Sequence, residues 1–223
     1  MGEISPRKLQ YGRMTRRGFL VLGVAGSALA LTRLRGGDEA AEGELAPTES
    51  DIEGPFYRED APFTDKLRSA ETKAPALFVS GVVRGTPGGA PLKEAIVDVW
   101  HADEMGHYDN EDSEDAKNFR FRGQMKTDKD GAYAFETIVP AAYRTGGESF
   151  RPAHIHYKVR AKGYRELTTQ LYFKGDPHLS KDRWAKKSNT KELVKHEAKE
   201  DLAARKLETP FYTCVFDIVL RKK

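Results

Sequence analysis

Arg151-Pro152-Ala153-His154-Ile155-His156 opens a β-leaning run that continues to Arg160. Successive side chains of a strand alternate between its two faces at about 3.3 Å per residue. Both imidazoles of a strand here therefore project from one face, roughly 6.6 Å apart at the backbone. Two ring nitrogens can converge on one metal ion from that separation. An isolated pair of this kind is equally typical of a strand whose histidines face solvent, so the neighbouring segments must decide.

The rest of the chain also reads mainly as β structure. Short apolar or alternating runs predict the strands, and one helix is expected within 190–206. The residue types of Asp128-Lys129-Asp130-Gly131 favour a turn. This turn predicts a hairpin between the strands on either side of it. We expect an antiparallel β-sandwich with long loops and one or two short helices. The predicted strands cover residues 77–83, 95–101, 124–127, 132–137, 154–160, 167–173 and 213–220.

Composition narrows the class of protein. The chain has 223 residues, of which 39% are hydrophobic and 32% are charged, with the two signs nearly balanced. A chain of this length and hydrophobic content can bury a core as one domain. The balanced charge predicts no nucleic-acid partner. The single cysteine, Cys214, lies in the predicted last strand and is expected to be a small core residue. With no partner, it offers neither a disulfide nor a thiolate metal site.

The N-terminus resembles an export signal. Thr15-Arg16-Arg17-Gly18-Phe19-Leu20 looks like a twin-arginine motif, and an apolar run of 13 residues covers 19–31. A stable membrane span needs about 20 residues, so none is expected. Ala28-Leu29-Ala30 fits a cleavage site, although an uncleaved basic anchor is the alternative. We expect a signal peptide over 1–30, a flexible lead-in over 31–50 and an exported domain over 51–223.

Tyrosines supply further possible metal ligands, because His107, His178 and His196 lie in polar context and His101 could be structural. Five motifs occur in a fixed order along the chain. They are Val97-Asp98-Val99-Trp100-His101-Ala102 followed by Gly106 and Tyr108; Thr127-Asp128 followed by Gly131 and Tyr133; Thr137-Ile138 followed by Pro140 and Tyr143; Arg151 to His156; and Leu167 to Pro177.

This pattern resembles the intradiol ring-cleavage dioxygenases, non-haem ferric enzymes that open catechols between the two hydroxyl-bearing carbons. The resemblance covers about 51–221, with 53–57 similar to the family's entry segment and 216–220 to its last strand. The run from Leu171 to Pro177 looks most like the iron-bearing subunit of protocatechuate 3,4-dioxygenase. The run from Val99 to Ala102 is closer to the catechol enzymes.

The resemblance implies a site and a reaction. Tyr108, Tyr143, His154 and His156 would bind one Fe(III) per chain, a donor set of anionic oxygen and imidazole nitrogen that suits a hard cation. Arg151 would stabilise negative charge that develops during the reaction, and Gln170 would orient substrate and oxygen. A catechol would displace Tyr143 from the iron, and reaction with O2 would give a cis,cis-muconate-type diacid.

Some questions stay open at this stage. The segment between Tyr143 and His154 is shorter than in protocatechuate dioxygenase, which leaves the shape of the substrate pocket in doubt. Arg120, Arg122 and Arg144 are candidates to contact a substrate carboxylate, and Pro55 and Tyr57 to form a pocket wall. A homo-oligomer, or a site completed by another chain, is also possible. The alternative functions are a secreted β-sandwich binding module without catalysis and a zinc or cupin-type enzyme using the two histidines.

Overall fold

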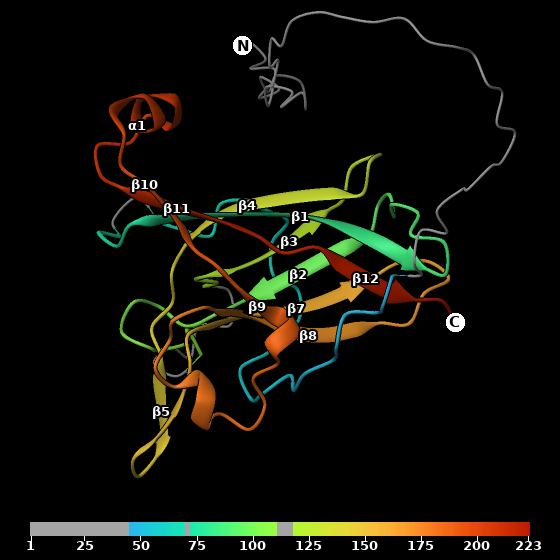
Figure 1. Ribbon diagram of the computed structural model, residues 1–223, viewed down its shortest axis with the longest axis horizontal. Helices are drawn as coiled ribbons and strands as arrows, with labels where there is room; N and C mark the ends of the chain where they lie inside the picture. Colours follow the sequence, from blue (N-terminus) through green and yellow to red (C-terminus); the bar gives the residue numbers. More distant parts are fainter. Residues whose placement is uncertain (1–44, 70–71, 111–117) are drawn as a thin grey trace, which may run out of the picture. The chain divides into compact units, whose positions relative to one another are not determined.

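The computed structural model describes residues 45–69, 72–110 and 118–223, and these form two main sheets and a separate hairpin (Figure 1). The expected signal peptide over 1–30 and most of the lead-in over 31–50 lie outside the described residues. The strands are β1 (Ala76–Thr86), β2 (Ile96–Trp100), β3 (Arg122–Lys126), β4 (Ala132–Ile138), β5 (Tyr143–Gly146), β6 (Ser149–Arg151), β7 (His154–Arg160), β8 (Leu167–Phe173), β9 (Thr190–Lys191), β10 (Val194–His196), β11 (Phe211–Val215) and β12 (Ile218–Arg221). The helices are the 3-10 turns η1 (Leu179–Lys181) and η2 (Lys187–Asn189) and the α-helix α1 (Lys199–Arg205).

The first sheet is built around the long strand β1. Strand β4 pairs with one edge of β1 in antiparallel fashion, while β11 and β12 pair in parallel with successive parts of the other edge, and β10 extends the sheet beyond β11. The second sheet has the order β3-β2-β7-β8-β9, and its only parallel pair is β8 with β9. The expected sandwich is therefore confirmed as mainly β, but its sheets are mixed rather than wholly antiparallel.

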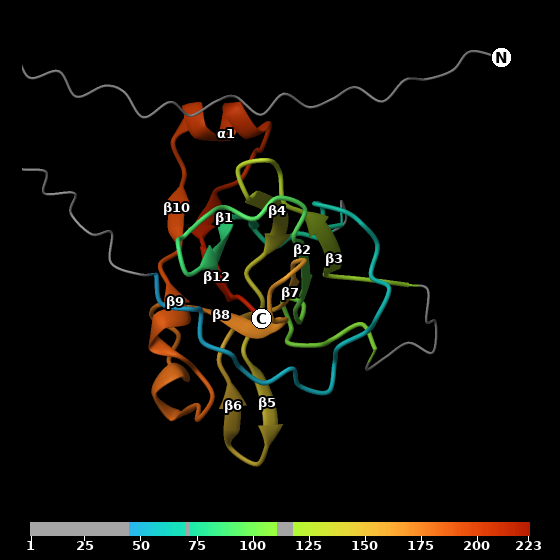
Figure 2. The same cartoon turned by 90° about the vertical axis from the view of Figure 1, so that its right-hand side faces the viewer.

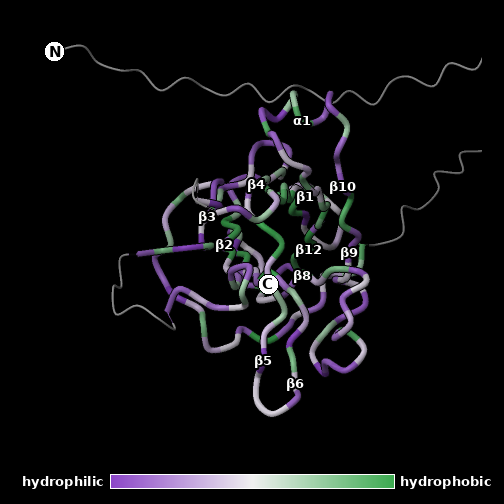
Figure 3. The backbone as a smooth tube through the Cα atoms, turned by 90° about the vertical axis from the view of Figure 1, so that its left-hand side faces the viewer, coloured by the Kyte–Doolittle hydropathy of each residue, from purple (hydrophilic) through white to green (hydrophobic). Residues whose placement is uncertain are grey.

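The core lies between the two sheets. Val79 and Phe135 of the first sheet pack into the same cluster as Val99, Ile155 and Tyr157 of the second. Figure 3 shows that the apolar residues concentrate in the strands of these two layers. The β5–β6 hairpin and α1 lie at opposite ends of the sandwich in two perpendicular views (Figures 1 and 2).

Alternation along the second sheet places the candidate ligands on its outer face. Ile155 and Tyr157 of β7 point into the core, so His154 and His156 point the other way. The outer face carries its own cluster of Trp100, Ala102 and Tyr108, against which Phe56, Tyr57 and Tyr143 pack. The histidines are therefore buried beneath loops rather than between the sheets.

Two local predictions need correction. The Asp128 turn exists, with the Asp128 N–H bonded to the Ala132 carbonyl at 3.0 Å, but β3 and β4 belong to different sheets and form no hairpin. Turn residues fix a reversal of the chain without fixing which strands pair, and β4 takes its seven partners from β1. The helix expected within 190–206 is confirmed as α1 at Lys199–Arg205, and the start of that range forms β9 and β10.

The predicted last strand is also interrupted, at Phe216 and Asp217. The Tyr133 hydroxyl donates to the Phe216 carbonyl at 2.5 Å, and the Asp217 carboxylate accepts the Val82 N–H at 2.8 Å. These side-chain contacts replace ladder bonds where the chain passes from β11 to β12. Gly81 lies opposite the interruption, where an added Cβ would be 2.0 Å from the Phe216 carbonyl oxygen.

Candidate metal centre

Two buried imidazoles face each other on the outer side of β7. The Nε2 atoms of His154 and His156 are 3.1 Å apart, and the Nδ1–H of His154 donates to the Pro152 carbonyl at 2.6 Å. That bond fixes the tautomer of His154 and turns its Nε2 lone pair toward His156. Two nitrogens bound at right angles to one ion, each with a bond of about 2.1 Å, lie about 3.0 Å apart. The pair therefore fits two positions on a single metal.

Both histidines are neutral in this environment. Burial, reinforced by the Arg151 guanidinium, lowers the pKa of His154 to about 3. Burial and the neighbouring His154 lower the pKa of His156 well below its usual value. Trp100 stacks on the His156 ring, with centroids 4.7 Å apart and planes 6° apart, and His156 Nδ1 has no hydrogen-bond partner among the described residues. Neutral rings keep the lone pairs that a metal requires.

Two tyrosine rings complete the cluster. Tyr108 follows β2 in a loop and is 1% exposed, while the half-buried Tyr143 begins β5. The two ring centroids are 5.7 Å apart; Tyr143 lies 5.7 Å from His154, and Tyr108 lies 6.2 Å from His156. All four residues that the sequence nominates as metal ligands therefore lie together.

Burial first, and the neighbouring Tyr143 second, raise the pKa of Tyr108 well above its usual value. Phe56 contributes to this dry environment by stacking on the Tyr108 ring at 4.1 Å and 11°. A phenol in such a setting loses its proton only when a cation is bound to its oxygen. Within the described residues, no three His, Cys, Asp or Glu side chains form a metal-binding group. The residues that lie beside the two histidines are Tyr108 and Tyr143, rather than the glutamate and later histidine of the zinc or cupin-type alternative.

The loop that carries Tyr108 is fixed to the segment that carries Tyr143. The Asp103 carboxylate accepts the N–H groups of Met105 and His107, at 2.8 and 2.9 Å, and its backbone carbonyl accepts the Ala141 N–H at 3.0 Å. Gly106 adopts φ +89°, and an added Cβ would lie 3.0 Å from the Tyr143 Cβ. The glycine of the Tyr108 motif is needed both for its backbone conformation and for this close approach.

Asp109, which directly follows Tyr108, is a structural residue that the sequence did not reveal. Its buried carboxylate accepts hydrogen bonds from Arg122 Nε at 2.7 Å and Arg58 Nη1 at 2.8 Å. Arg122 is therefore buried in an internal ion pair, and its contact with a substrate carboxylate stays a prediction. Arg120 and Arg144 are exposed, and the Arg144 guanidinium lies 5.3 Å from the Phe150 ring centroid.

Arg151 and Gln170, the two residues predicted to assist catalysis, are in direct contact beside the histidines. Arg151 Nη2 donates to Gln170 Oε1 at 2.6 Å and to the Tyr172 hydroxyl at 3.1 Å. Arg151 Nε donates to Asp182 at 2.7 Å. Both predicted residues are buried, which excludes the alternative that either one is a solvated surface side chain.

An extended segment over 48–57, here called the strap, crosses the outer face of β8 and reaches the cluster. The Asp51 N–H donates to the Thr168 carbonyl at 2.9 Å, and Gln170 Nε2 donates to the Ile52 carbonyl at 2.7 Å. Gly54 lies against His156, where an added Cβ would be 3.5 Å from Cε1 of that ring. Tyr57 packs on Trp100, whereas Pro55 is exposed.

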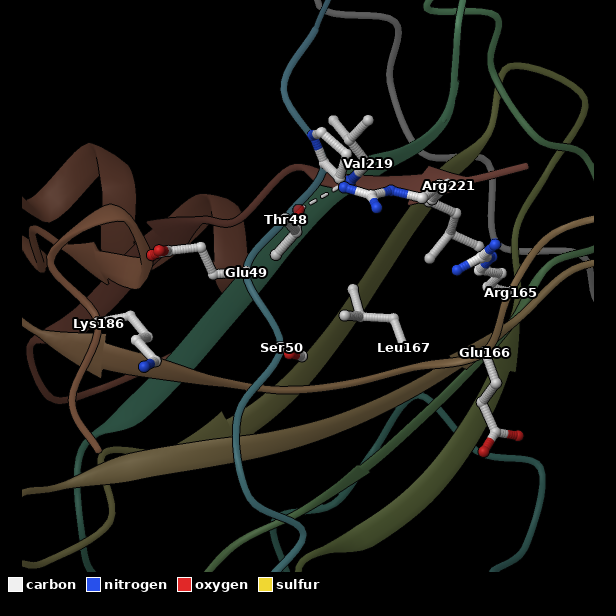
Figure 4. A pocket seen from close by; sticks show the side chains of 11 residues that line it. Thr48, Glu49, Ser50, Arg165, Glu166, Leu167, Lys186, Val219 and Arg221 are labelled. Carbon is white, nitrogen blue, oxygen red and sulfur yellow. Dashed lines mark hydrogen bonds between the residues drawn. The ribbon is translucent and has the colours of Figure 1, made fainter. Parts of the chain in front are cut away.

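The remaining candidates lie elsewhere. His101 is buried as a structural residue, bonded to the Ala102 carbonyl and the Thr137 hydroxyl. Cys214 is buried as predicted. A separate pocket of about 490 Å³ lies beside the start of the strap, with Arg165 and Arg221 on one side and Lys186 on the other (Figure 4). None of the four nominated metal ligands lines it. Among the described residues, no helix has the length and apolar character of a membrane span.

Fold and site together define a β-sandwich protein with a cluster of two tyrosines and two histidines on one outer face. The protein-family model described as Dioxygenase matches residues 52–222. Catechol 1,2-dioxygenase from Acinetobacter baylyi is 33% identical over 205 residues, covering 83% of this chain and 66% of the relative. The chain therefore belongs to the intradiol ring-cleavage dioxygenase family.

Solved structures agree with this assignment. Wild-type catechol 1,2-dioxygenase from Acinetobacter radioresistens is similar with a TM-score of 0.74 and 30% identity, covering 80% of this chain and 64% of that one. The dioxygenase domain of a dioxygenase and carbohydrate-binding protein fusion from Streptomyces sp. SirexAA-E is 33% identical, with a TM-score of 0.64, over 80% of this chain and all of that domain. The chain spans 56% to 66% of the length of the curated catechol and chlorocatechol 1,2-dioxygenases to which it is similar.

Proposed function

We propose that the protein is an iron-dependent intradiol dioxygenase that inserts O2 into a catechol-type aromatic to give a cis,cis-muconate-type diacid. The observation that carries the proposal is the pair of buried, neutral histidines, with Nε2 atoms 3.1 Å apart, beside Tyr108 and Tyr143. One ferric ion per chain would be held by these four residues. When bound, it would supply a Lewis acid that promotes deprotonation of the catechol and activates it toward O2.

The protein residues have separate tasks in this proposal. Tyr143 is the more exposed of the two tyrosines and begins a projecting hairpin, so it is the ligand that we assign to leave the metal and accept a catechol proton. Tyr108 is held by the Phe56 stack and stays in place. Arg151 carries a permanent positive charge beside the histidines and stabilises negative charge on the reacting substrate. Gln170 fixes that arginine and the strap together.

Metal analysis tests the proposal directly. Protein expressed with sufficient iron should contain about one ferric ion per chain and absorb visible light through tyrosinate-to-iron charge transfer. With catechol it should consume O2 and form a diacid. A colourless protein that retains zinc under the same conditions would overturn the assignment. A colourless protein without any metal affinity would favour the non-catalytic binding module.

We also propose that the chain is exported through the twin-arginine route, which carries folded proteins. The Arg16-Arg17 pair, the 13-residue apolar run and the Ala28-Leu29-Ala30 cleavage pattern support this. Arg16→Lys combined with Arg17→Lys should retain the precursor in the cytoplasm, whereas Arg7→Lys should not. Sequencing of the exported protein should find its N-terminus near Leu31. An exported chain that still begins at Met1 would exclude cleavage.

A further inference from the structure

We propose that Asp182 is a positioning residue for Arg151, so that the ion pair between them sets which guanidinium nitrogen faces a ligand on the metal. The inference rests on the proposed dioxygenase function. Asp182 lies in the loop after η1, 28 positions beyond His154, and belongs to none of the motifs that indicate the site.

Asp182 is bonded on both of its carboxylate oxygens. Oδ1 accepts the N–H groups of Trp184 and Ala185, at 2.8 and 2.7 Å, which fixes the loop around it. Oδ2 accepts the Arg151 Nε–H at 2.7 Å, and the side chains of this pair are only 1% and 4% exposed. The acid therefore holds the arginine from a turn that is itself rigidly closed.

The other contacts of Arg151 leave one nitrogen available. Nη2 donates to Gln170 and Tyr172, and the guanidinium carbon lies 4.9 Å from the Trp184 ring centroid. No acceptor for Nη1 is found within the described residues, and this nitrogen is not among the fully buried unsatisfied atoms. With Nε and Nη2 both bonded, the guanidinium plane cannot rotate, and Nη1 is the donor left to reach a ligand.

Charge explains why an acid is needed at this position. Gln170 and Tyr172 are neutral acceptors, so they orient the guanidinium without offsetting its charge. A buried cation without a counter-charge is strongly unfavourable. Among the described residues, Asp182 is the acid that forms an ion pair with Arg151. Removal of its charge should let the guanidinium turn toward other acceptors or toward water, which would move Nη1 out of place.

Asp182→Asn separates this role from a structural one. The amide oxygen can still accept the Trp184 and Ala185 N–H groups, whereas the amide NH₂ cannot accept the Arg151 Nε–H. In metal-free protein, the Arg151 Nε–H NMR signal should exchange slowly with solvent in the unchanged chain and rapidly in Asp182→Asn. In iron-loaded protein, kcat should fall about 10²-fold at unchanged iron content, the loss typical of one misplaced electrostatic donor, and KM should change less.

The matched control is Asp217→Asn, because Asp217 also accepts a backbone N–H, from Val82, but lies between β11 and β12 of the first sheet. It should leave both the Arg151 signal and kcat unchanged. A double-mutant cycle with Arg151→Gln tests the route of the effect. If Asp182 acts through Arg151, then Asp182→Asn should lower kcat further by less than twofold in the Arg151→Gln background. That double variant also removes the unpaired buried charge, so it addresses any failure of Asp182→Asn to fold.

Unchanged Arg151 exchange in Asp182→Asn, or equal losses of kcat in both backgrounds, would overturn the positioning role while leaving the dioxygenase function intact. Absence of iron and turnover in the unchanged chain would instead overturn the proposed function. The Arg151 signal would still decide whether Asp182 fixes the guanidinium.

Discussion

Asp109 and Arg122 form an ion pair that is buried on both sides, with 2.6 Å between Arg122 Nη2 and Asp109 Oδ1. Arg58 contributes a second guanidinium at 2.8 Å from Asp109 Oδ2. Because Asp109 directly follows Tyr108, this arrangement anchors the loop that carries one of the proposed iron ligands.

Asp109→Ala should lower the free energy of unfolding by about 3–5 kcal/mol, because it leaves the Arg122 charge buried without a counter-ion. Urea denaturation of the metal-free protein measures this effect. Asp130→Ala removes an exposed partner of Lys129 and should stay within about 0.5 kcal/mol of the unchanged chain. Similar values for the two variants would mean that the buried pair contributes little.

His154→Ala and His156→Ala should each reduce iron affinity by at least about tenfold, since even the loss of an outer partner of a metal ligand costs that much. Iron content and visible absorbance of the purified variants check this. His196→Ala is the control, because His196 is bonded to Thr213 in the first sheet. Full iron content in either site variant would remove that histidine from the ligand set.

The two tyrosines should behave differently. Tyr143→Phe should retain some iron on the other three ligands, but kcat should fall about 10²–10⁴-fold because the leaving phenolate no longer accepts the catechol proton. Tyr108→Phe should alter the colour of the resting site and leave that proton acceptor in place. Anaerobic titration with catechol decides between the roles. Release of Tyr108 from the iron in the Tyr143→Phe variant would contradict the assignment.

His101 should make the fold sensitive to acid. Burial lowers its pKa to about 4, from an ordinary value near 6.5, so the unfolded chain binds a proton that the folded chain does not. The contribution of His101 to the free energy of unfolding is fully present above pH 6.5. As the pH falls toward 4, this contribution decreases by at most about 3 kcal/mol.

Replacement of His101 by Gln should flatten the dependence of unfolding free energy on pH between 4 and 6.5. Asp98 contributes with the opposite sign, because burial raises its pKa to about 6, but it is present in both proteins and cancels in the comparison. Parallel curves for the two proteins would show that His101 is not the responsible group.

Gly81→Ala should destabilise the first sheet by about 1–3 kcal/mol or more, because the added methyl group would overlap the Phe216 carbonyl. Thermal unfolding checks the effect. Gly163→Ala tests an open position, where an added Cβ meets no atom within 4 Å and only the positive φ opposes it. A smaller loss at Gly81 than at Gly163 would contradict the crowding argument.

The sequence predicted β7 and β8 with their observed bounds, because both are short runs rich in β-branched, aromatic and other apolar residues. The grouping of the four residues nominated as metal ligands also follows from the sequence, since each belongs to a motif of the family. The sequence did not predict the strand that pairs with β4 or the interruption at Phe216. These depend on hydrogen bonds such as that from Tyr133 to Phe216, between residues 83 positions apart, for which no local pattern exists.

The same limit applies around the site. Asp109 and Asp182 look like ordinary acids in polar segments, and only the fold reveals that each neutralises a buried arginine. The burial of Arg122 has the same cause, because its acidic partner Asp109 lies on a separate loop.

The positions of the four proposed ligands also determine which of them would be lost first when the chain unfolds locally. His154 and His156 lie on β7, which is hydrogen-bonded to β2 on one side and to β8 on the other. Tyr108 lies in a loop, and Tyr143 begins the β5–β6 hairpin outside the two main sheets. Loop segments open at lower free energy than central strands. By this rule a partly opened chain would keep the two imidazoles on β7 without the phenolates, a donor set that suits zinc or copper better than Fe(III). Order in the loops would thus favour Fe(III) over those metals at the proposed site.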